Sequence, residues 1–136
     1  MRKMNPVLAG LSLAVIIATT AAAKAPLREV AEIDDKMFSV ALAIEISDKC
    51  DEIDARTLKG VNFLWSLKRR AGALGYSDDE IDAYRKSPDE KARMRARGEA
   101  YVKSKGLNPK SAADLCTLGH AEIASGSLTG SLLKAK

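Results

Sequence analysis

Two cysteines, Cys50 and Cys116, are the most reactive side chains in this sequence of 136 residues. An even number of cysteines in an exported chain favours a disulfide. The bond would close a loop of 67 residues, for which chain entropy predicts about 4 kcal/mol of stabilisation. Two buried free thiols are the alternative. A redox-active pair is disfavoured because the Cys-x-x-Cys spacing is absent.

Two carboxylates are candidates for acid–base chemistry. Glu45 lies between the two apolar sides of an expected helix, and Glu122 falls between Leu115 and Leu118 on a helical wheel. A buried carboxylate either pairs with a base or has a raised pKa, and the second state suits catalysis. Pairing with an arginine is the commoner outcome, and Arg56 is a candidate partner. A hydrolase of envelope polymers using both acids would need them to face one cleft.

A basic run on one expected helix invites an anion-binding interpretation, with Arg93 and Arg97 as its candidate residues. The anion would be a phosphate, a lipopolysaccharide or a membrane surface. Acidic residues three or four positions away give the run mixed sign, which is typical of ordinary ion pairs on a solvated helix face. We therefore favour a solvated face. The run consists of Lys91, Arg93, Arg95 and Arg97.

His120 is the only histidine, and the sequence places no other ligand at metal-site or triad spacing around it, unless Cys116 is free. The acidic residues 78–82 lack the glycine and glutamate positions of a calcium-binding loop. We expect no metal, cofactor or catalytic residue, and a surface position for His120.

The first 23 residues have the pattern of a secretory signal peptide. Arg2 and Lys3 precede a mostly apolar run at residues 7–18, and small residues follow at the expected cleavage point after Ala23, with Ala25 as the alternative. The run is shorter than the roughly 20 apolar residues of a spanning helix. We expect a periplasmic or secreted chain, residues 24–136, that spans no membrane after cleavage. It keeps 20 basic and 18 acidic residues, a balance that demands no nucleic-acid partner.

The element that positions Cys50 is an expected helix at residues 27–49, apolar on two opposite sides. A helix at the surface shows one apolar stripe, whereas one that is apolar nearly all round lies inside a domain. We therefore expect this helix to be the centre of the fold. Its two sides carry Ile33, Met37, Val40 and Ile44, and Phe38, Leu42 and Ile46.

Further helices are expected after it. Serine followed three positions later by glutamate, at Ser77 and at Ser87, predicts two capping boxes. No strand-like alternation of useful length appears. Gly126 and Gly130 could let another helix approach closely, but for these glycines we favour a flexible, frayed C-terminus. Docking of the apolar residues 128–133 as a last helical turn is the alternative. The predicted fold is all-α: a small bundle of about five helices around a central apolar helix, joined by one disulfide. The further helices lie at residues 52–74, from 77, at 87–104 and from 111.

The expected helix at residues 52–74 carries a wide apolar stripe. We expect it to pack along the central helix. The stripe consists of Leu58, Val61, Leu64, Trp65, Leu67, Ala71 and Leu74.

Several stretches together resemble a known family. They are residues 26–30, Cys50, residues 74–84, residues 115–119 and the C-terminal residues 122–133. They resemble small exported proteins of rhodobacteria-like alphaproteobacteria, grouped as a domain of unknown function. The resemblance implies a periplasmic or secreted helical domain with one disulfide, and it implies no active-site residue.

We therefore expect a structural or binding module without catalytic activity. Its partner would be another periplasmic protein or an anionic envelope component. The alternatives are the small hydrolase described above and a periplasmic holdase that binds unfolded clients. A binding module should expose an apolar patch or groove, whereas an enzyme should hold a desolvated acid in a polar cleft.

Overall fold

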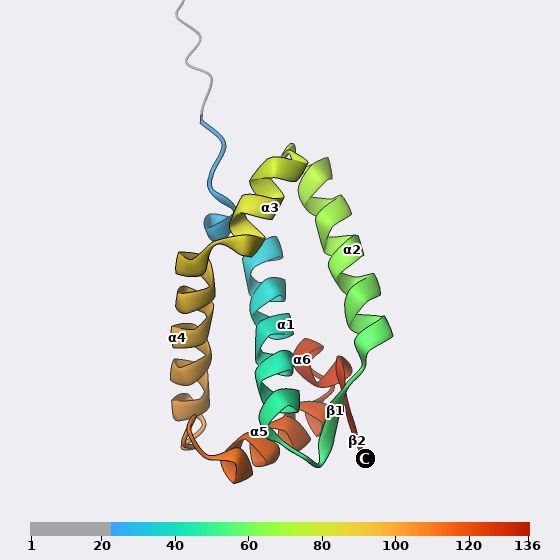
Figure 1. The fold of residues 1–136 in the computed structure, drawn as a ribbon, viewed down its shortest axis with the longest axis vertical. Helices are drawn as coiled ribbons and strands as arrows, with labels where there is room; N and C mark the ends of the chain where they lie inside the picture. The colour runs from blue at the N-terminus through green and yellow to red at the C-terminus, as the bar shows by residue number, and fades with distance from the viewer. Residues whose placement is uncertain (1–22) are drawn as a thin grey trace, which may run out of the picture.

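The computed structural model describes residues 23–136, so the predicted signal peptide lies outside the described residues except at its last position. In this part of the chain the fold is helical, with one small sheet (Figure 1). No helix in it combines the length and apolar content needed to cross a bilayer. The elements are a 3-10 turn η1 (Leu27–Glu29), α1 (Ala31–Lys49), β1 (Ile53–Ala55), α2 (Thr57–Ala73), α3 (Asp78–Lys86), α4 (Pro88–Ser104), α5 (Ala112–Ser125), α6 (Leu128–Ser131) and β2 (Leu133–Ala135).

Helix α1 is the centre of the fold, as its sequence predicts. Figure 1 shows it between α4 and α2, with α5 and α6 around its C-terminal end. Both of its apolar sides contribute buried residues, among them Val40 and Leu42. One position differs from the expectation, because Ile44 is 51% exposed. The side of α1 around Ile44 is therefore not fully covered by the rest of the chain.

The helix starts follow the capping signals in the sequence. The Ser77 hydroxyl accepts from the Glu80 amide, and the Glu80 carboxylate accepts from the Ser77 amide, which completes the predicted capping box of α3. At α4, Ser87 accepts from the Glu90 amide and Pro88 occupies the first position, but the second predicted capping box is incomplete. The Glu90 carboxylate bonds Arg93 and Arg28 instead of the Ser87 amide. These caps satisfy amides that have no partner inside a helix.

The all-α prediction is confirmed, but the structure also contains one small sheet that no alternation in the sequence indicated. Residues 53–55 form β1, which pairs antiparallel with β2 in the register Ile53 to Ala135 and Ala55 to Leu133. The second helix consequently begins at Thr57 instead of residue 52. Strands of three residues are too short for a period-two pattern to be recognised in the sequence, and it is their pairing that makes them strands.

The buried side chains form two clusters along α1. One surrounds its C-terminal half and joins α1 to α5, α6 and both strands. The other surrounds its N-terminal end and joins α1 to η1, α2 and α3. Phe63 of α2 packs against both clusters, so the core is continuous along α1.

The C-terminus is packed, contrary to the expectation that it frays. Gly126 ends α5 in the left-handed conformation, with φ of 67°. Helix α6 then folds back on α5 so closely that a Cβ at Gly130 would stand 2.0 Å from the Glu122 carbonyl oxygen. The two glycines therefore serve the tight turn and the close approach of α6 to α5.

Candidate functional site

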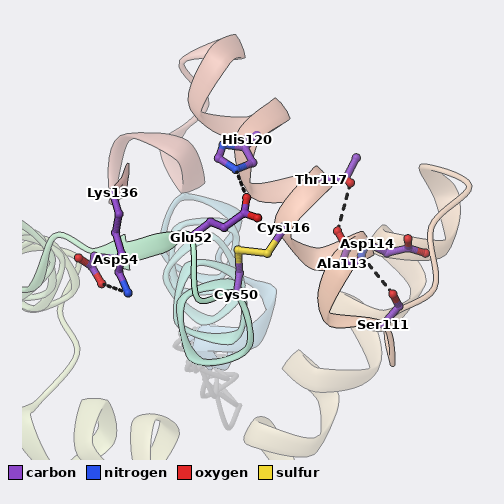
Figure 2. Close-up of a disulfide and its surroundings, with 10 residues drawn as sticks. All are labelled: Cys50, Glu52, Asp54, Ser111, Ala113, Asp114, Cys116, Thr117, His120 and Lys136. Atoms are coloured by element: carbon purple, nitrogen blue, oxygen red, sulfur yellow. Dashed lines mark hydrogen bonds and ion pairs between the residues drawn. A yellow bond between two sulfur atoms is a disulfide. The ribbon is translucent and has the colours of Figure 1, made fainter.

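The disulfide joins the end of α1 to α5, as predicted. Cys50 follows α1 directly and Cys116 lies in the second turn of α5, with sulfur atoms 2.03 Å apart and Cα atoms 5.1 Å apart (Figure 2). His120 lies one turn further along α5 and is exposed, and its Nε2 is 3.0 Å from Oε2 of Glu52. Bonded sulfurs offer no thiolate for a nucleophile or a metal ligand, so these residues define a structural site in this state.

Glu45 is not a buried acid. Its side chain is 46% exposed, and its carboxylate lies 2.7 Å from Nζ of Lys49, one helical turn away. The suggested partner Arg56 instead begins α2, beside the small sheet. The helical wheel placed Glu45 between two apolar sides, but one of those sides is open to solvent near Ile44. The open side leaves the carboxylate hydrated.

Glu122 is buried, with 7% of its surface exposed. Its carboxylate accepts hydrogen bonds from the hydroxyls of Tyr101 on α4 and Ser127 before α6. The bond to Glu122, together with partial burial, raises the pKa of Tyr101 to about 12. Glu122 therefore ties three helices together. It lies on α5, whereas Glu45 lies on α1 and lines a hollow to which Glu122 does not contribute.

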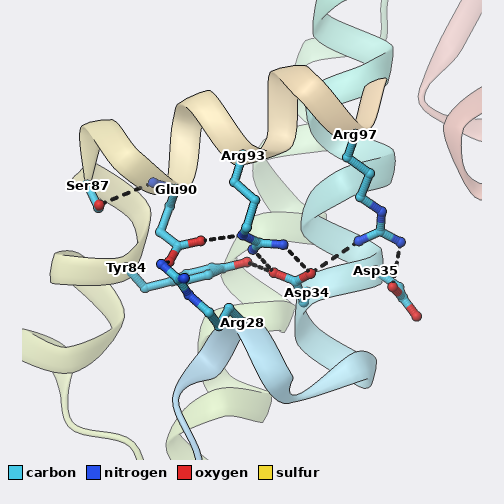
Figure 3. A network of polar contacts seen from close by, with 8 residues as sticks. All are labelled: Arg28, Asp34, Asp35, Tyr84, Ser87, Glu90, Arg93 and Arg97. Carbon is cyan, nitrogen blue, oxygen red and sulfur yellow. Dashed lines mark hydrogen bonds and ion pairs between the residues drawn. The ribbon is translucent and has the colours of Figure 1, made fainter. Parts of the chain in front are cut away.

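Arg93 and Arg97 do not form a free anion-binding face, and neither is simply solvated. Both point from α4 to α1, where they share the buried carboxylate of Asp34 (Figure 3). Arg93 also bonds Glu90, and Arg97 bonds Asp35 at 2.6 Å. Their positive charges are neutralised within the chain. This network joins α4 to α1.

The Asp34 carboxylate is the centre of this network. It accepts the Tyr84 hydroxyl at 2.6 Å in addition to the two guanidinium groups. Burial alone would raise the pKa of Asp34, but the hydrogen bonds from Arg93 and Tyr84 outweigh it and lower that pKa. Burial and the bond to Asp34 raise the pKa of Tyr84. Asp34 is therefore an ionised anchor and a poor proton donor or acceptor for catalysis.

The remaining candidate site is an apolar groove along α1. Its floor is the open side of α1, and its walls come from α2 and α4. Two adjoining hollows, of about 320 and 580 Å³, make up the groove, and they share Met37, Leu64, Tyr84 and Arg85. These volumes fall in the range of ligand pockets. The apolar lining of floor and walls includes Ile33, Met37, Val40, Ala41, Ile44, Val61, Leu64, Trp65 and Met94.

The groove exposes large apolar side chains to solvent. Ile44, Val61 and Trp65 are 51%, 43% and 56% exposed. Exposed apolar residues that gather in one hollow mark an interaction site more often than scattered ones do. Sequence reasoning assigned all three to the core. One signal in the sequence could have indicated this exposure. The apolar stripe of α2 is wider than packing against α1 alone requires.

Fold and site together define a small helical protein with one disulfide and an open apolar groove. The chain belongs to a family of unknown function, DUF5333, whose pattern matches residues 25–134. No curated protein and no solved structure gives a significant match to it.

Proposed function

We propose that this protein is an exported binding module without catalytic activity, which holds an apolar partner in the groove along α1. The observation that carries the proposal is the exposure of Ile44, Val61 and Trp65 in the two adjoining hollows of the groove. Leaving such surface in water costs about 25 cal/mol for each Å². A partner that covers it therefore gains binding energy from the hydrophobic effect.

Binding is favoured over hydrolysis by the surroundings of the two candidate acids. Glu45 is ion-paired to Lys49 at the edge of the groove, and Glu122 accepts two hydroxyls outside it. The two hollows along α1 are lined mostly by apolar side chains, and Glu122 lines neither of them, so they differ from the polar cleft with a desolvated acid that we expect of an enzyme. Export is supported by the signal-peptide pattern and by the disulfide, which persists in oxidising compartments.

The binding test uses Trp65, the single tryptophan, as a reporter in the wall of the groove. A neutral apolar fluorophore, N-phenyl-1-naphthylamine, is titrated into the protein. We expect saturable one-to-one binding that quenches Trp65. Ala41→Phe fills the floor of the groove without changing charge and should abolish the effect. Ala96→Phe makes the same change at an exposed position of α4 outside the groove and should bind as wild type does.

A second variant guards against misfolding. Ile44→Gln alters a half-exposed side chain, so it should leave the circular dichroism spectrum unchanged while it weakens probe binding. Equal binding by wild type and both groove variants would refute the proposal. Suppression of the aggregation of unrelated unfolded proteins, unaffected by Ala41→Phe, would instead identify a holdase. Mass spectrometry of the periplasmic protein should give a chain that begins at Lys24; a retained leader would refute cleavage.

A further inference from the structure

We propose that the groove binds one amphipathic helix of about 16 residues whose apolar stripe is flanked by acidic side chains. The inference rests on the proposed function and names the class of partner. It follows from the length of the groove, the spacing of its floor residues and the charge on its rim.

The groove has the dimensions of a helix. Its lining extends along α1 from Ile33 to Lys49, which at 1.5 Å per residue is about 24 Å. The walls are helices on either side of α1, as Figure 1 shows for α2 and α4. A helix laid along this groove would contact three helices at once. An apolar hollow between helices is a usual binding site for an amphipathic helix.

The floor offers positions into which the side chains of a helix fit. Met37, Ala41 and Ile44 follow one another at steps of four and three residues, so they form one line along α1. Ala41 is small, and Gly98 on the α4 wall has open space where a Cβ would stand. The large residues can therefore contact the sides of a partner helix while the small ones admit its protruding side chains. Trp65 adds an aromatic wall, the residue type most enriched at binding hot spots.

At the rim of the groove, which is the exposed edge of its two walls, the charged side chains left without an ion pair are positive. Lys91 and Arg95 lie four residues apart on the α4 wall, both exposed, and neither has an ion-pair partner in the described part of the chain. On the opposite wall, the Nζ of Lys68 lies 5.7 Å from the Trp65 ring centroid. It also forms an ion pair of 3.4 Å with Oδ1 of Asp78, whose side chain is 80% exposed.

The acids of the rim are already paired. Glu45 bonds Lys49, and Glu99 bonds Lys110. Glu90 is buried in the Asp34 network. The groove therefore carries cations on both of its walls. A partner helix with acidic side chains on both sides of its apolar stripe would complement them. Charge pairs at such a rim contribute specificity and encounter rate more than affinity.

Within residues 23–136, a second copy of this chain offers no such helix. Its acidic helix α3 has only nine residues, and α2 and α4 carry basic residues on their exposed faces. The groove is also concave, which suits a helix better than a flat lipid surface. The occupant is therefore an acidic helix of another protein.

The experiment compares three 16-residue peptides without tryptophan. The first has leucines at helical spacing and glutamates beside them, the second replaces the glutamates by lysines, and the third scrambles the leucines. We expect one-to-one binding of the acidic peptide, followed by Trp65 fluorescence. It should bind about five- to tenfold more tightly than the lysine peptide, and 0.5 M salt should narrow this difference. The scrambled peptide should not bind.

Charge-reversal variants make the test specific to the rim. Lys91→Glu with Arg95→Glu should reverse the preference and favour the lysine peptide. Arg69→Glu with Lys103→Glu changes the net charge equally at exposed positions outside the groove, and should keep the preference for the acidic peptide. Equal binding of both charged peptides, or a preference that the rim variant leaves unchanged, overturns the charge argument.

The outcomes separate this inference from the proposed function. Binding of the neutral fluorophore without any peptide binding would mean a small apolar ligand, so the inference fails while the proposed function stands. If neither binds, both fail. Binding of the wild-type protein to vesicles of anionic phospholipid, lost in the rim variant and unaccompanied by peptide binding, would assign the groove to a membrane surface and refute the helix.

Discussion

Replacing Asp34 by asparagine tests the network that joins α1 to α4. The substitution keeps the shape of the side chain and its hydrogen bond to the Tyr84 hydroxyl, but it removes the negative charge. Arg93 and Arg97 then face each other's positive charge across a neutral amide (Figure 3). We expect the folded state to lose stability, because two cations lose their shared partner.

The magnitude follows from the exposure of the three groups. Removing one member of a fully buried ion pair costs about 3–5 kcal/mol, whereas exposed pairs contribute less than about 1 kcal/mol. The side chain of Asp34 is 6% exposed, but those of Arg93 and Arg97 are 31% and 36% exposed. Water can therefore solvate the arginines in the variant. We expect a loss of about 2–3 kcal/mol in the free energy of unfolding.

The effect should depend on pH in a defined direction. The pKa of Asp34 in the folded state lies below its ordinary value of 3.8, so the unfolded chain takes up the proton first as the pH falls. The stabilisation is therefore complete above about pH 5 and is lost as the pH drops through the folded-state pKa. The difference between wild type and Asp34→Asn should be constant from pH 7 to about pH 5 and should shrink below about pH 4.

Urea unfolding followed by circular dichroism at several pH values measures this difference, with the disulfide intact. Asp35→Asn is the matched control, since Asp35 is 62% exposed and bonds Arg97 alone; its cost should stay below about 1 kcal/mol. Equal losses in the two variants, or a full loss in Asp34→Asn that persists at pH 2.5, would show that Asp34 is not the anchor of the network.

Three further predictions concern the fold. Reducing the disulfide should lower the free energy of unfolding by about 4 kcal/mol in urea titrations, and no change would contradict the loop-closure reasoning. Gly119→Ala puts a Cβ 2.5 Å from the Ile53 Cδ1 methyl and should lower the free energy of unfolding by about 1–3 kcal/mol. Gly72→Ala has open space around it and should raise the free energy of unfolding by up to about 1 kcal/mol. Similar effects of the two variants would refute the packing argument. Glu122→Gln should lower the pKa of Tyr101 from about 12 in an ultraviolet titration, and an unchanged value would assign that pKa to burial alone.

The sequence predicted the elements whose signals are local. The serine and glutamate pair at residues 77 and 80 predicted the start of α3, because capping depends on neighbours within one turn. The two apolar sides of residues 31–49 predicted a central helix. The cysteine pair predicted the bond that joins α1 to α5. Each of these inferences needs only spacing along the chain or the even count of cysteines.

What the sequence missed depends on contacts between distant segments. The partners of Arg93 and Arg97 lie about 60 positions away on α1, so their neighbours in sequence suggested only surface pairs. The strands exist because residues 53–55 meet 133–135. Burial of Glu45 was predicted wrongly for a related reason. A helical wheel shows which side chains share a face, but it does not show whether another element covers that face.

The candidate site illustrates the same division. The spacing of an apolar residue on α2 predicts that the residue is buried, whether or not a partner helix lies against it. The sequence determined that Ile44, Val61 and Trp65 face apolar sides of their helices. Only the tertiary structure left those sides uncovered and placed them together in one groove, because the burial of a side chain is a property of the packed helices and not of the helix that carries it.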